Sequence, residues 1–235
     1  MKLTPKLIAS IATLLAASIT QAADSKVHRV LSIQDVQTDD PVAYAATVGA
    51  SNAMAKSKLG LDAFIRVYVS TYDGEKTNSV RAVIAGDSVA ALTKNFAALV
   101  NDPEMKPTRD KLTATRKLGA RVLYQGLRFD GTYKNGSIYS TIANVSDEAG
   151  YLKALDGLRV IFDAHDLKDV HINAYRVLAG RSDHTHRVTL SVPSEDRLSA
   201  LLDFVSGDSD MAAWLASAAK FRTVVANGTS QEITQ

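Results

Sequence analysis

The sequence predicts an α+β fold made of two tandem ferredoxin-like repeats. Residues from about 28 to 128 and from about 137 to 227 share one order of elements, β-α-β-β-α-(α)-β, which is the split βαβ arrangement. Identical residues recur in the two halves at a separation that slides from 108 for Gly49/Gly157 to 106 for Arg81/Arg187. A period near 107 is too long for a solenoid repeat and suits a whole small domain.

The first 22 residues have the pattern of a secretory signal peptide. Lys2 and Lys6 give a positively charged start, an apolar run follows from Leu7 to Ile19, and Thr20-Gln21-Ala22 forms a small-x-small cleavage site. The run is too short to span a bilayer, which needs about 20 apolar residues. We therefore expect an exported chain, periplasmic or secreted, with no membrane contact after the leader is removed.

The first repeat, assigned to residues 23–128, begins with a β-rich run from Val30 to Val36. Asp39-Asp40-Pro41 marks a helix start, because proline is tolerated in the first turn, and the helix is expected to end near Gly60. Two β-runs, 63–71 and 79–85, flank a turn-rich segment at 73–76 and predict a hairpin. A helix over 88–100, a further helical segment after Asp102-Pro103-Glu104 and a strand over 121–128 complete this repeat.

The second repeat, assigned to residues 137–227, copies this order. The expected elements are a strand over 138–145, a helix over 147–163, strands over 169–178 and 185–192, helices over 194–206 and from about 208, and a strand over 222–226. A ferredoxin-like sheet carries helices on one face and leaves the other uncovered, so it normally pairs with a second sheet. Here the second sheet lies in the same chain, and we expect the two halves to pack sheet to sheet.

Composition excludes several classes of protein. The chain has 27 basic and 25 acidic residues, and two of the basic ones lie in the leader, so the remaining chain is neutral and shows no basic run of the kind that binds nucleic acid. It contains no cysteine, which rules out a thiol nucleophile, cysteine-ligated zinc and disulfides. An exported chain of this kind relies on core burial, which about 210 residues can supply.

One segment resembles a known superfamily. Residues 80–96, VRAVIAGDSVAALTKNF, followed by Asn101-Asp102-Pro103-Glu104, are similar to a strand, a serine-capped helix and an Asp-Pro-Glu turn of the dimeric α/β-barrel superfamily. That superfamily includes the antibiotic-biosynthesis-monooxygenase, EthD-like and NIPSNAP groups. The resemblance implies an intramolecular dimeric α/β barrel, and because its motifs are structural it transfers no catalytic residue.

The two hairpins predict which side chains share a face. Residues directly opposite each other across an antiparallel pair point to the same face of the sheet. Placing Tyr175 opposite Thr189 separates polar from apolar side chains, whereas a one-residue slip sets Arg176 opposite Arg187, like charge against like charge. The matching register divides the first hairpin in the same way. The apolar face is expected to carry the helices and consists of Ile65, Val67, Val69, Val80, Ala82, Ile84, Val170, Ile172, Ala174, Val188, Leu190 and Val192.

The other face of both hairpins is mixed and is expected to look into the space between the sheets, where a barrel of this type holds a ligand. We therefore predict a pocket suited to a polar or anionic small molecule. Its candidate ligand-binding residues are Arg66, Tyr68, Arg81, His171, Asn173, Tyr175 and Arg187. The alternative is that these groups satisfy one another's hydrogen bonds inside the molecule or face solvent at the barrel rim.

The other histidines and the single tryptophan predict no further site. His184 and His186 lie on one face of a strand beside a turn, and we interpret them as solvated rather than as metal ligands, so no metal is expected. His165 near a helix end is expected to complement the negative pole of that helix. Trp214 is spaced as a core residue of a helix.

The sequence reveals no reaction, and three functions remain open. The first is an exported protein that binds a small molecule without catalysis and without a cofactor. The second is a cofactor-independent monooxygenase or isomerase in which a tyrosine or histidine assists proton transfer. The third is a haem enzyme with His171 as axial ligand, which no other residue supports. A homo-oligomer is compatible with all three.

Overall fold

The computed structural model describes residues 30–61, 65–72, 79–180 and 182–234 of the 235-residue chain. The leader predicted over residues 1–22 and the turn predicted at 73–76 lie outside the described residues. None of the described helices combines the length and the hydropathy that a membrane span requires.

The two repeats form the predicted order of elements. The first consists of β1 (Val30–Gln37), α2 (Pro41–Leu59), β2 (Ile65–Tyr72), β3 (Ser79–Gly86), α3 (Val89–Asn101), the 3-10 turn η1 (Pro103–Met105), α4 (Lys106–Ala114) and β4 (Lys117–Phe129). The second consists of β5 (Ser137–Val145), α5 (Glu148–Ala164), β6 (His171–Gly180), β7 (His186–Val192), α6 (Glu195–Gly207), α7 (Ser209–Ala218) and β8 (Arg222–Glu232).

Equivalent residues begin the helices of the two repeats. The side chains of Asp40 and Asp147 accept a hydrogen bond from the backbone N–H three residues later, at 2.9 and 3.0 Å, and so cap α2 and α5. Ser88 and Ser194 cap α3 and α6 in the same way. Each cap satisfies one of the backbone N–H groups that have no partner within the helix. The predicted end of α2 is confirmed, since Gly60 adopts a left-handed conformation with φ of 60°.

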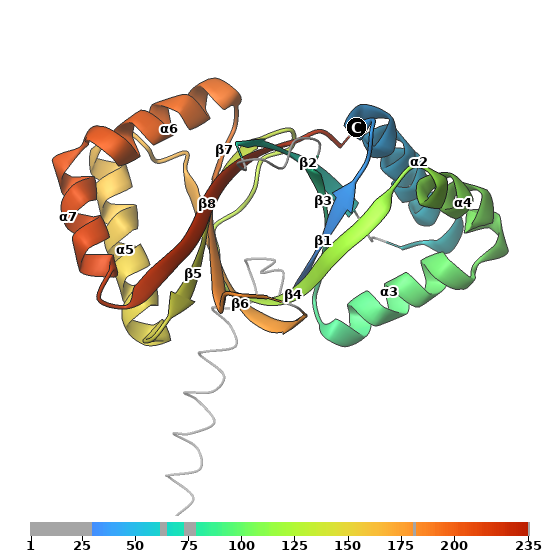
Figure 1. The fold of residues 1–235 in the computed structure, drawn as a ribbon, viewed down its shortest axis with the longest axis horizontal. Helices are drawn as coiled ribbons and strands as arrows, with labels where there is room; N and C mark the ends of the chain where they lie inside the picture. Colours follow the sequence, from blue (N-terminus) through green and yellow to red (C-terminus); the bar gives the residue numbers. More distant parts are fainter. Residues whose placement is uncertain (1–29, 62–64, 73–78, 181, 235) are drawn as a thin grey trace, which may run out of the picture.

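The eight strands close into one antiparallel barrel, in the order β1-β3-β2-β8-β5-β7-β6-β4 (Figure 1). Each repeat contributes a four-stranded sheet of ferredoxin-like order, β4-β1-β3-β2 and β8-β5-β7-β6. The sheets join edge to edge, because β2 pairs with β8 and β4 pairs with β6. The predicted intramolecular barrel is therefore confirmed, with both sheet edges paired at the joints and the uncovered faces enclosing one interior.

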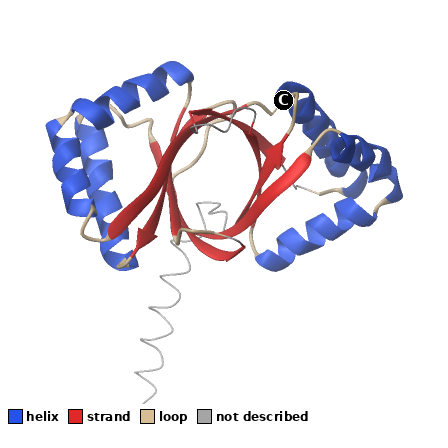
Figure 2. Cartoon of the chain, in the orientation of Figure 1, coloured by secondary structure: helices blue, strands red, loops and turns tan. Residues whose placement is uncertain are grey.

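The helices cover the outside of the barrel in two groups, one for each repeat (Figure 2). The apolar hairpin face packs beneath them as predicted: Val67 and Val80 lie in a cluster with Tyr44 and Val48 of α2. In the second repeat a larger cluster joins the strands to α5, α6 and α7 and includes Trp214, which is buried as predicted and donates its indole N–H to the Ala154 carbonyl at 2.7 Å. The barrel interior is thus left to the mixed face.

The predicted hairpin register was wrong by two residues. Tyr175 lies opposite Arg187, and Thr189 lies opposite Asn173. In the first repeat, Tyr68 lies opposite Arg81, which is the equivalent pairing. A two-residue shift leaves each side chain on the same face, because strand side chains alternate with a period of two. The division into an outer apolar face and an inner mixed face is therefore unaffected.

Candidate functional site

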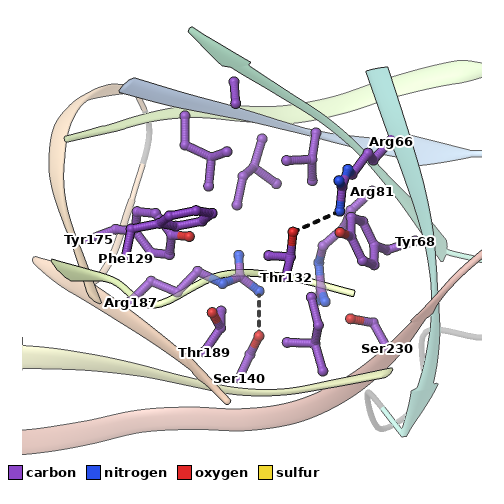
Figure 3. Close-up of a pocket in the computed structure, with 15 residues that line it drawn as sticks. Arg66, Tyr68, Arg81, Phe129, Thr132, Ser140, Tyr175, Arg187, Thr189 and Ser230 are labelled. Carbon is purple, nitrogen blue, oxygen red and sulfur yellow. Dashed lines mark hydrogen bonds between the residues drawn. The ribbon is translucent and has the colours of Figure 1, made fainter. Parts of the chain in front are cut away.

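A cavity of about 240 Å³ lies inside the barrel (Figure 3). Every one of the eight strands contributes side chains to its wall, and Thr132 contributes from the segment between the repeats. The lining residues are Leu31, Ile33, Arg66, Tyr68, Arg81, Val83, Ala85, Phe129, Thr132, Ile138, Ser140, Tyr175, Arg187, Thr189 and Ser230. The wall therefore combines apolar side chains with three arginines, two tyrosines and four smaller hydroxyl groups.

Five of the seven predicted site residues line this cavity. They are Arg66, Tyr68, Arg81, Tyr175 and Arg187. These five residues converge because side chains alternate along a strand, and all five lie on the inner face of the β2-β3 or the β6-β7 hairpin. The alternative of a solvent-facing rim does not apply to Tyr68, Tyr175 and Arg187, which are all buried.

The other two predicted site residues do not line the cavity. The amide of Asn173 is buried and holds the segment between the repeats: its Oδ1 accepts from the Asp130 N–H at 2.9 Å, and its Nδ2 donates to the Gly131 carbonyl at 2.9 Å. The ring of His171 stacks on Tyr133 with 4.5 Å between ring centres. Both residues lie on the inner face of β6, but at its beginning, beside the segment between the repeats. His171 is not among the lining residues of the cavity, as an axial haem ligand there would be.

Several lining residues were missed by the sequence prediction. Phe129, Ile138, Ser140 and Ser230 come from β4, β5 and β8, whose inner faces were not assigned, and Thr132 comes from the connection. The alternation of β5 could have identified Ile138 and Ser140, because this strand lies beside β7 and its parity follows from that pairing. Ser230 lies beyond the predicted end of its strand, which continues to Glu232 instead of ending at 226.

Arg187 is a buried cation whose hydrogen-bond partners in the described structure are neutral. Its side chain is enclosed, with the residue 9% exposed, and its Nη2 donates to the Ser140 Oγ at 3.3 Å. No carboxylate of the described residues lies within ion-pair distance of it. Burial and the like charge of Arg81 lower the pKa of Arg187, and the Tyr124 hydroxyl and the more distant Asp35 carboxylate oppose that lowering. The site thus holds a cation whose desolvation is incompletely compensated.

The other two arginines of the cavity have acidic neighbours. The Arg81 Nε lies 3.7 Å from the Asp35 Oδ1, and the Arg66 Nη1 lies 3.5 Å from the Glu232 Oε2. The Arg66 Nη1 also donates to the Thr132 Oγ1 at 2.9 Å. The Glu232 side chain is only 1% exposed, and burial raises its pKa while Arg66 opposes the rise. The positive charge of the cavity is therefore least balanced at Arg187.

The two cavity tyrosines are suited to donating hydrogen bonds. Burial raises the pKa of both Tyr68 and Tyr175, so their hydroxyls stay protonated at neutral pH. A neutral phenol donates one hydrogen bond and cannot act as a strong base at that pH. Among the lining residues in the described part of the chain, none is a histidine, an aspartate or a glutamate.

The prediction that His184 and His186 are solvated was wrong. The His184 side chain is 8% exposed and its Nε2 lies 2.9 Å from the Tyr124 hydroxyl. His186 is buried, and its Nε2 lies 2.9 Å from the Glu148 Oε2. The strand pattern placed these residues beside a turn but could not show that β4 and α5 cover them.

His165 caps the C-terminal end of α5, and its Nε2 lies 3.1 Å from the Asp210 Oδ2. Within the described residues, these two side chains and Asp208 form the one group whose potential metal-ligating atoms all lie within 4.8 Å of one another. The Asp208 carboxylate already caps α7 by accepting from two backbone N–H groups, so this group has a structural explanation as an N-cap with an ion pair.

Comparison with known proteins gives a match at the level of the fold. No protein-family model matches the sequence, and no curated protein does. Among solved structures, a presumed monooxygenase from Lactobacillus acidophilus NCFM aligns with a TM-score of 0.56 and 8% identity, over 86% of this chain and 92% of that one. An anthrone oxidase-like protein aligns with a TM-score of 0.51 and 13% identity, over 87% and 91% of the two chains.

A variant of chlorite dismutase from Candidatus Nitrospira defluvii, solved in complex with cyanide, aligns with a TM-score of 0.53 and 8% identity, over 88% and 92% of the two chains. Identities this low show the shared fold alone. The resemblance of the sequence to dimeric α/β-barrel proteins is thereby confirmed for the whole architecture, and the activity of this chain has to be argued from its own cavity.

Proposed function

We propose that this chain is an exported protein that binds a small organic anion inside its barrel, with Arg187 as the principal contact of the anionic group. The observation that carries this proposal is the buried Arg187, which has only neutral hydrogen-bonding neighbours in the described structure and stands near a second arginine. An anion between Arg187 and Arg81 would supply the missing negative charge and form charge-assisted hydrogen bonds.

The shape and lining of the cavity support a ligand with an apolar part. Its volume of about 240 Å³ is below the roughly 300–1,000 Å³ of pockets that hold drug-sized molecules, which favours a compact ligand. The apolar part of the cavity wall is formed by Leu31, Ile33, Val83, Phe129 and Ile138. A small carboxylate with an aliphatic or aromatic body matches both features.

A cofactor-independent monooxygenase or isomerase is the second candidate, and the names of two solved structures of the same fold favour it. Proton transfer at neutral pH needs a group whose pKa lies near the working pH. The described wall of the cavity offers tyrosines whose pKa is raised by burial, and no histidine or carboxylate. These residues support binding more strongly than catalysis. Consumption of oxygen together with conversion of a bound molecule would favour the second candidate.

Export is part of the proposal and rests on the N-terminal pattern. The leader over residues 1–22, with its cleavage site before Ala23, supports a periplasmic or secreted protein. The absence of cysteine is compatible with either compartment, because the barrel has two helix-covered cores that need no disulfide.

Titration calorimetry with matched ligand pairs tests the binding proposal. Benzoate and butyrate are compared with benzamide and butyramide, which have nearly the same shape and no charge. We expect the carboxylates to bind at least tenfold more tightly than the amides, since a charge-assisted hydrogen bond to a buried arginine contributes about 1.5–3 kcal/mol. Equal affinities within each pair would contradict an anion site.

A further inference from the structure

A hydrogen-bonded chain leads from the protein surface to the hydroxyl of Tyr124, which interacts electrostatically with Arg187. Asp183 has a side chain that is 78% exposed, and its Oδ1 lies 3.1 Å from the His184 Nδ1. The His184 Nε2 lies 2.9 Å from the hydroxyl of Tyr124, a residue of β4 that is 1% exposed. Both histidine nitrogens are therefore engaged, one toward solvent and one toward the barrel.

The partners of His184 fix which nitrogen carries its proton. The Ser182 Oγ donates its single proton to the His184 carbonyl at 2.9 Å, so it acts as an acceptor toward the Nδ1 at 2.9 Å. The carboxylate of Asp183 is likewise an acceptor. The Nδ1 of neutral His184 must therefore be the protonated nitrogen, which leaves the Nε2 as an acceptor for the Tyr124 O–H.

Tyr124 connects this chain to the cavity. Because the Tyr124 proton points to His184, the lone pairs of its oxygen remain available to Arg187. Burial raises the pKa of Tyr124, and the charge of Arg187 and its hydrogen bond to the Tyr124 oxygen oppose that rise. The Tyr124 ring also packs edge-on against Tyr175 of the cavity wall, with 6.4 Å between ring centres. A change in the charge of His184 is thus transmitted through one residue to the proposed anion contact.

We propose that His184 is a positioning residue that couples proton uptake to anion binding in the barrel; this rests on the proposed anion site. Protonation turns the Nε2 into a donor toward Tyr124 and adds a positive charge behind Arg187. Among the described residues, the charged groups that face this chain are Asp183 beside the imidazole and Asp35, Arg81 and Arg187 around the Tyr124 hydroxyl. Two of these described groups are negative and two are positive, so an anion bound at Arg187 adds negative charge and favours the protonated form of His184.

The sign of the pH dependence follows from reciprocity. If a bound anion favours the protonated form of His184, then protonated His184 favours the bound anion by the same factor. Histidine changes its charge between about pH 8 and pH 5.5. Over this range the affinity for benzoate should rise by roughly fivefold, which is at the low end of typical couplings between sites. The His184→Asn variant should still bind benzoate, but its affinity should no longer depend on pH, because the amide side chain is always neutral.

Calorimetry with benzoate at several pH values, in buffers of different ionisation enthalpy, measures the proton uptake directly. We expect net uptake by the wild type, none by His184→Asn, and a weakened dependence in Tyr124→Phe, which lacks the connecting hydroxyl. His186→Asn is the matched control, because His186 faces Glu148 of α5 and should leave the uptake unchanged. If benzoate binds with equal affinity from pH 8 to pH 5.5, the coupling is wrong and the anion site stands.

NMR of the ligand-free protein tests the coupling even if benzoate does not bind, an outcome that would count against the proposed function. Nitrogen-15 shifts at pH 8 should identify the Nδ1–H form of His184, because both groups beside the Nδ1 are acceptors. The Nε2–H form would overturn the proposal, because the Tyr124 O–H would then have no acceptor on His184.

Discussion

Arg81 and Arg187 occupy equivalent positions in the two repeats, and both side chains line one cavity inside the barrel. Each lies directly opposite a tyrosine of its own hairpin, Tyr68 or Tyr175. Burial and the charge of Arg81 together lower the pKa of Arg187. Closure of the barrel has therefore brought two cations from separate repeats into one desolvated space, an arrangement that an anion would stabilise.

Replacing Arg187 with methionine should weaken anion binding without unfolding the protein. Loss of a charge-assisted hydrogen bond costs about 1.5–3 kcal/mol, or roughly 10- to 150-fold in affinity for benzoate. The free energy of unfolding should stay the same or rise, since a buried charge without a carboxylate partner is removed. Calorimetry and urea unfolding measure the two effects.

Arg176→Met is the control for that variant, because Arg176 lies on β6 outside the cavity and pairs with Glu148. Its benzoate affinity should equal that of the wild type. If Arg187→Met unfolds the protein or binds benzoate normally, Arg187 is a structural residue and the site assignment falls.

A second prediction concerns the joint between β4 and β6. Gly180 has φ of 110°, and an added Cβ would lie 2.3 Å from the Arg121 carbonyl oxygen of the other repeat. Gly180→Ala should therefore lower the free energy of unfolding by more than about 1 kcal/mol. Gly157→Ala, on the exposed face of α5 with open space around it, should raise that free energy by roughly 0.5–1 kcal/mol. Equal effects of the two substitutions would argue against the pairing of β4 with β6.

A third prediction concerns acid stability. Two hydrogen bonds from Arg197, at 2.6 and 2.8 Å, hold the pKa of the Asp169 carboxyl below its usual range. Because the pKa of Asp169 is lower in the folded state, the ion pair stabilises the fold at a pH above the pKa of the unfolded state, about 3.9. This stabilisation is lost as the pH falls through the pKa of the folded state.

Asp169→Asn should therefore destabilise the protein at pH 7 by less than about 1 kcal/mol, because the pair is partly exposed. The difference should shrink as the pH falls below about 3.9 and vanish once the folded-state carboxyl is protonated. A difference that persists unchanged in acid would show that Asp169 acts through neutral hydrogen bonds rather than through its charge.

Export gives a fourth prediction. Expressed in a bacterial host with its full sequence, the mature protein should begin at Ala23 and be recovered from the periplasm or the medium. N-terminal sequencing decides this. An intact leader with Lys2 and Lys6 on material retained in the membrane would overturn both export and the neutral charge of the mature chain.

The inner face of the hairpins could be predicted from the sequence, because successive side chains of a strand point to opposite faces and the polar and apolar residues alternate in the same way. Tyr68, Arg81, Tyr175 and Arg187 were found in this way. The same argument could not fix the register, since Tyr175 opposite Thr189 and the observed Tyr175 opposite Arg187 place every side chain on the same face. Only a turn or a tertiary contact separates two registers that differ by two residues.

The rest of the site depends on contacts that the pattern of one hairpin does not contain. Parity assigned His171 to the interior, but the residue lies where β6 begins and stacks on Tyr133 of the inter-repeat segment. His184 was expected in solvent, yet Tyr124 of β4 covers it. Both differences arise because pairing of β4 with β6 joins distant parts of the chain, which local alternation cannot predict.

Mass spectrometry of small molecules that leave the purified protein on denaturation is the most direct test of an anion site in the barrel. The protein is taken from the exported fraction of its native host, so that the ligand is chosen by the cavity rather than by the experimenter. We predict an organic anion of small size that accompanies the wild type and is lost from Arg187→Met, while Arg176→Met retains it. A neutral or cationic molecule, or equal amounts of one anion in the wild type and Arg187→Met, would contradict the role of Arg187.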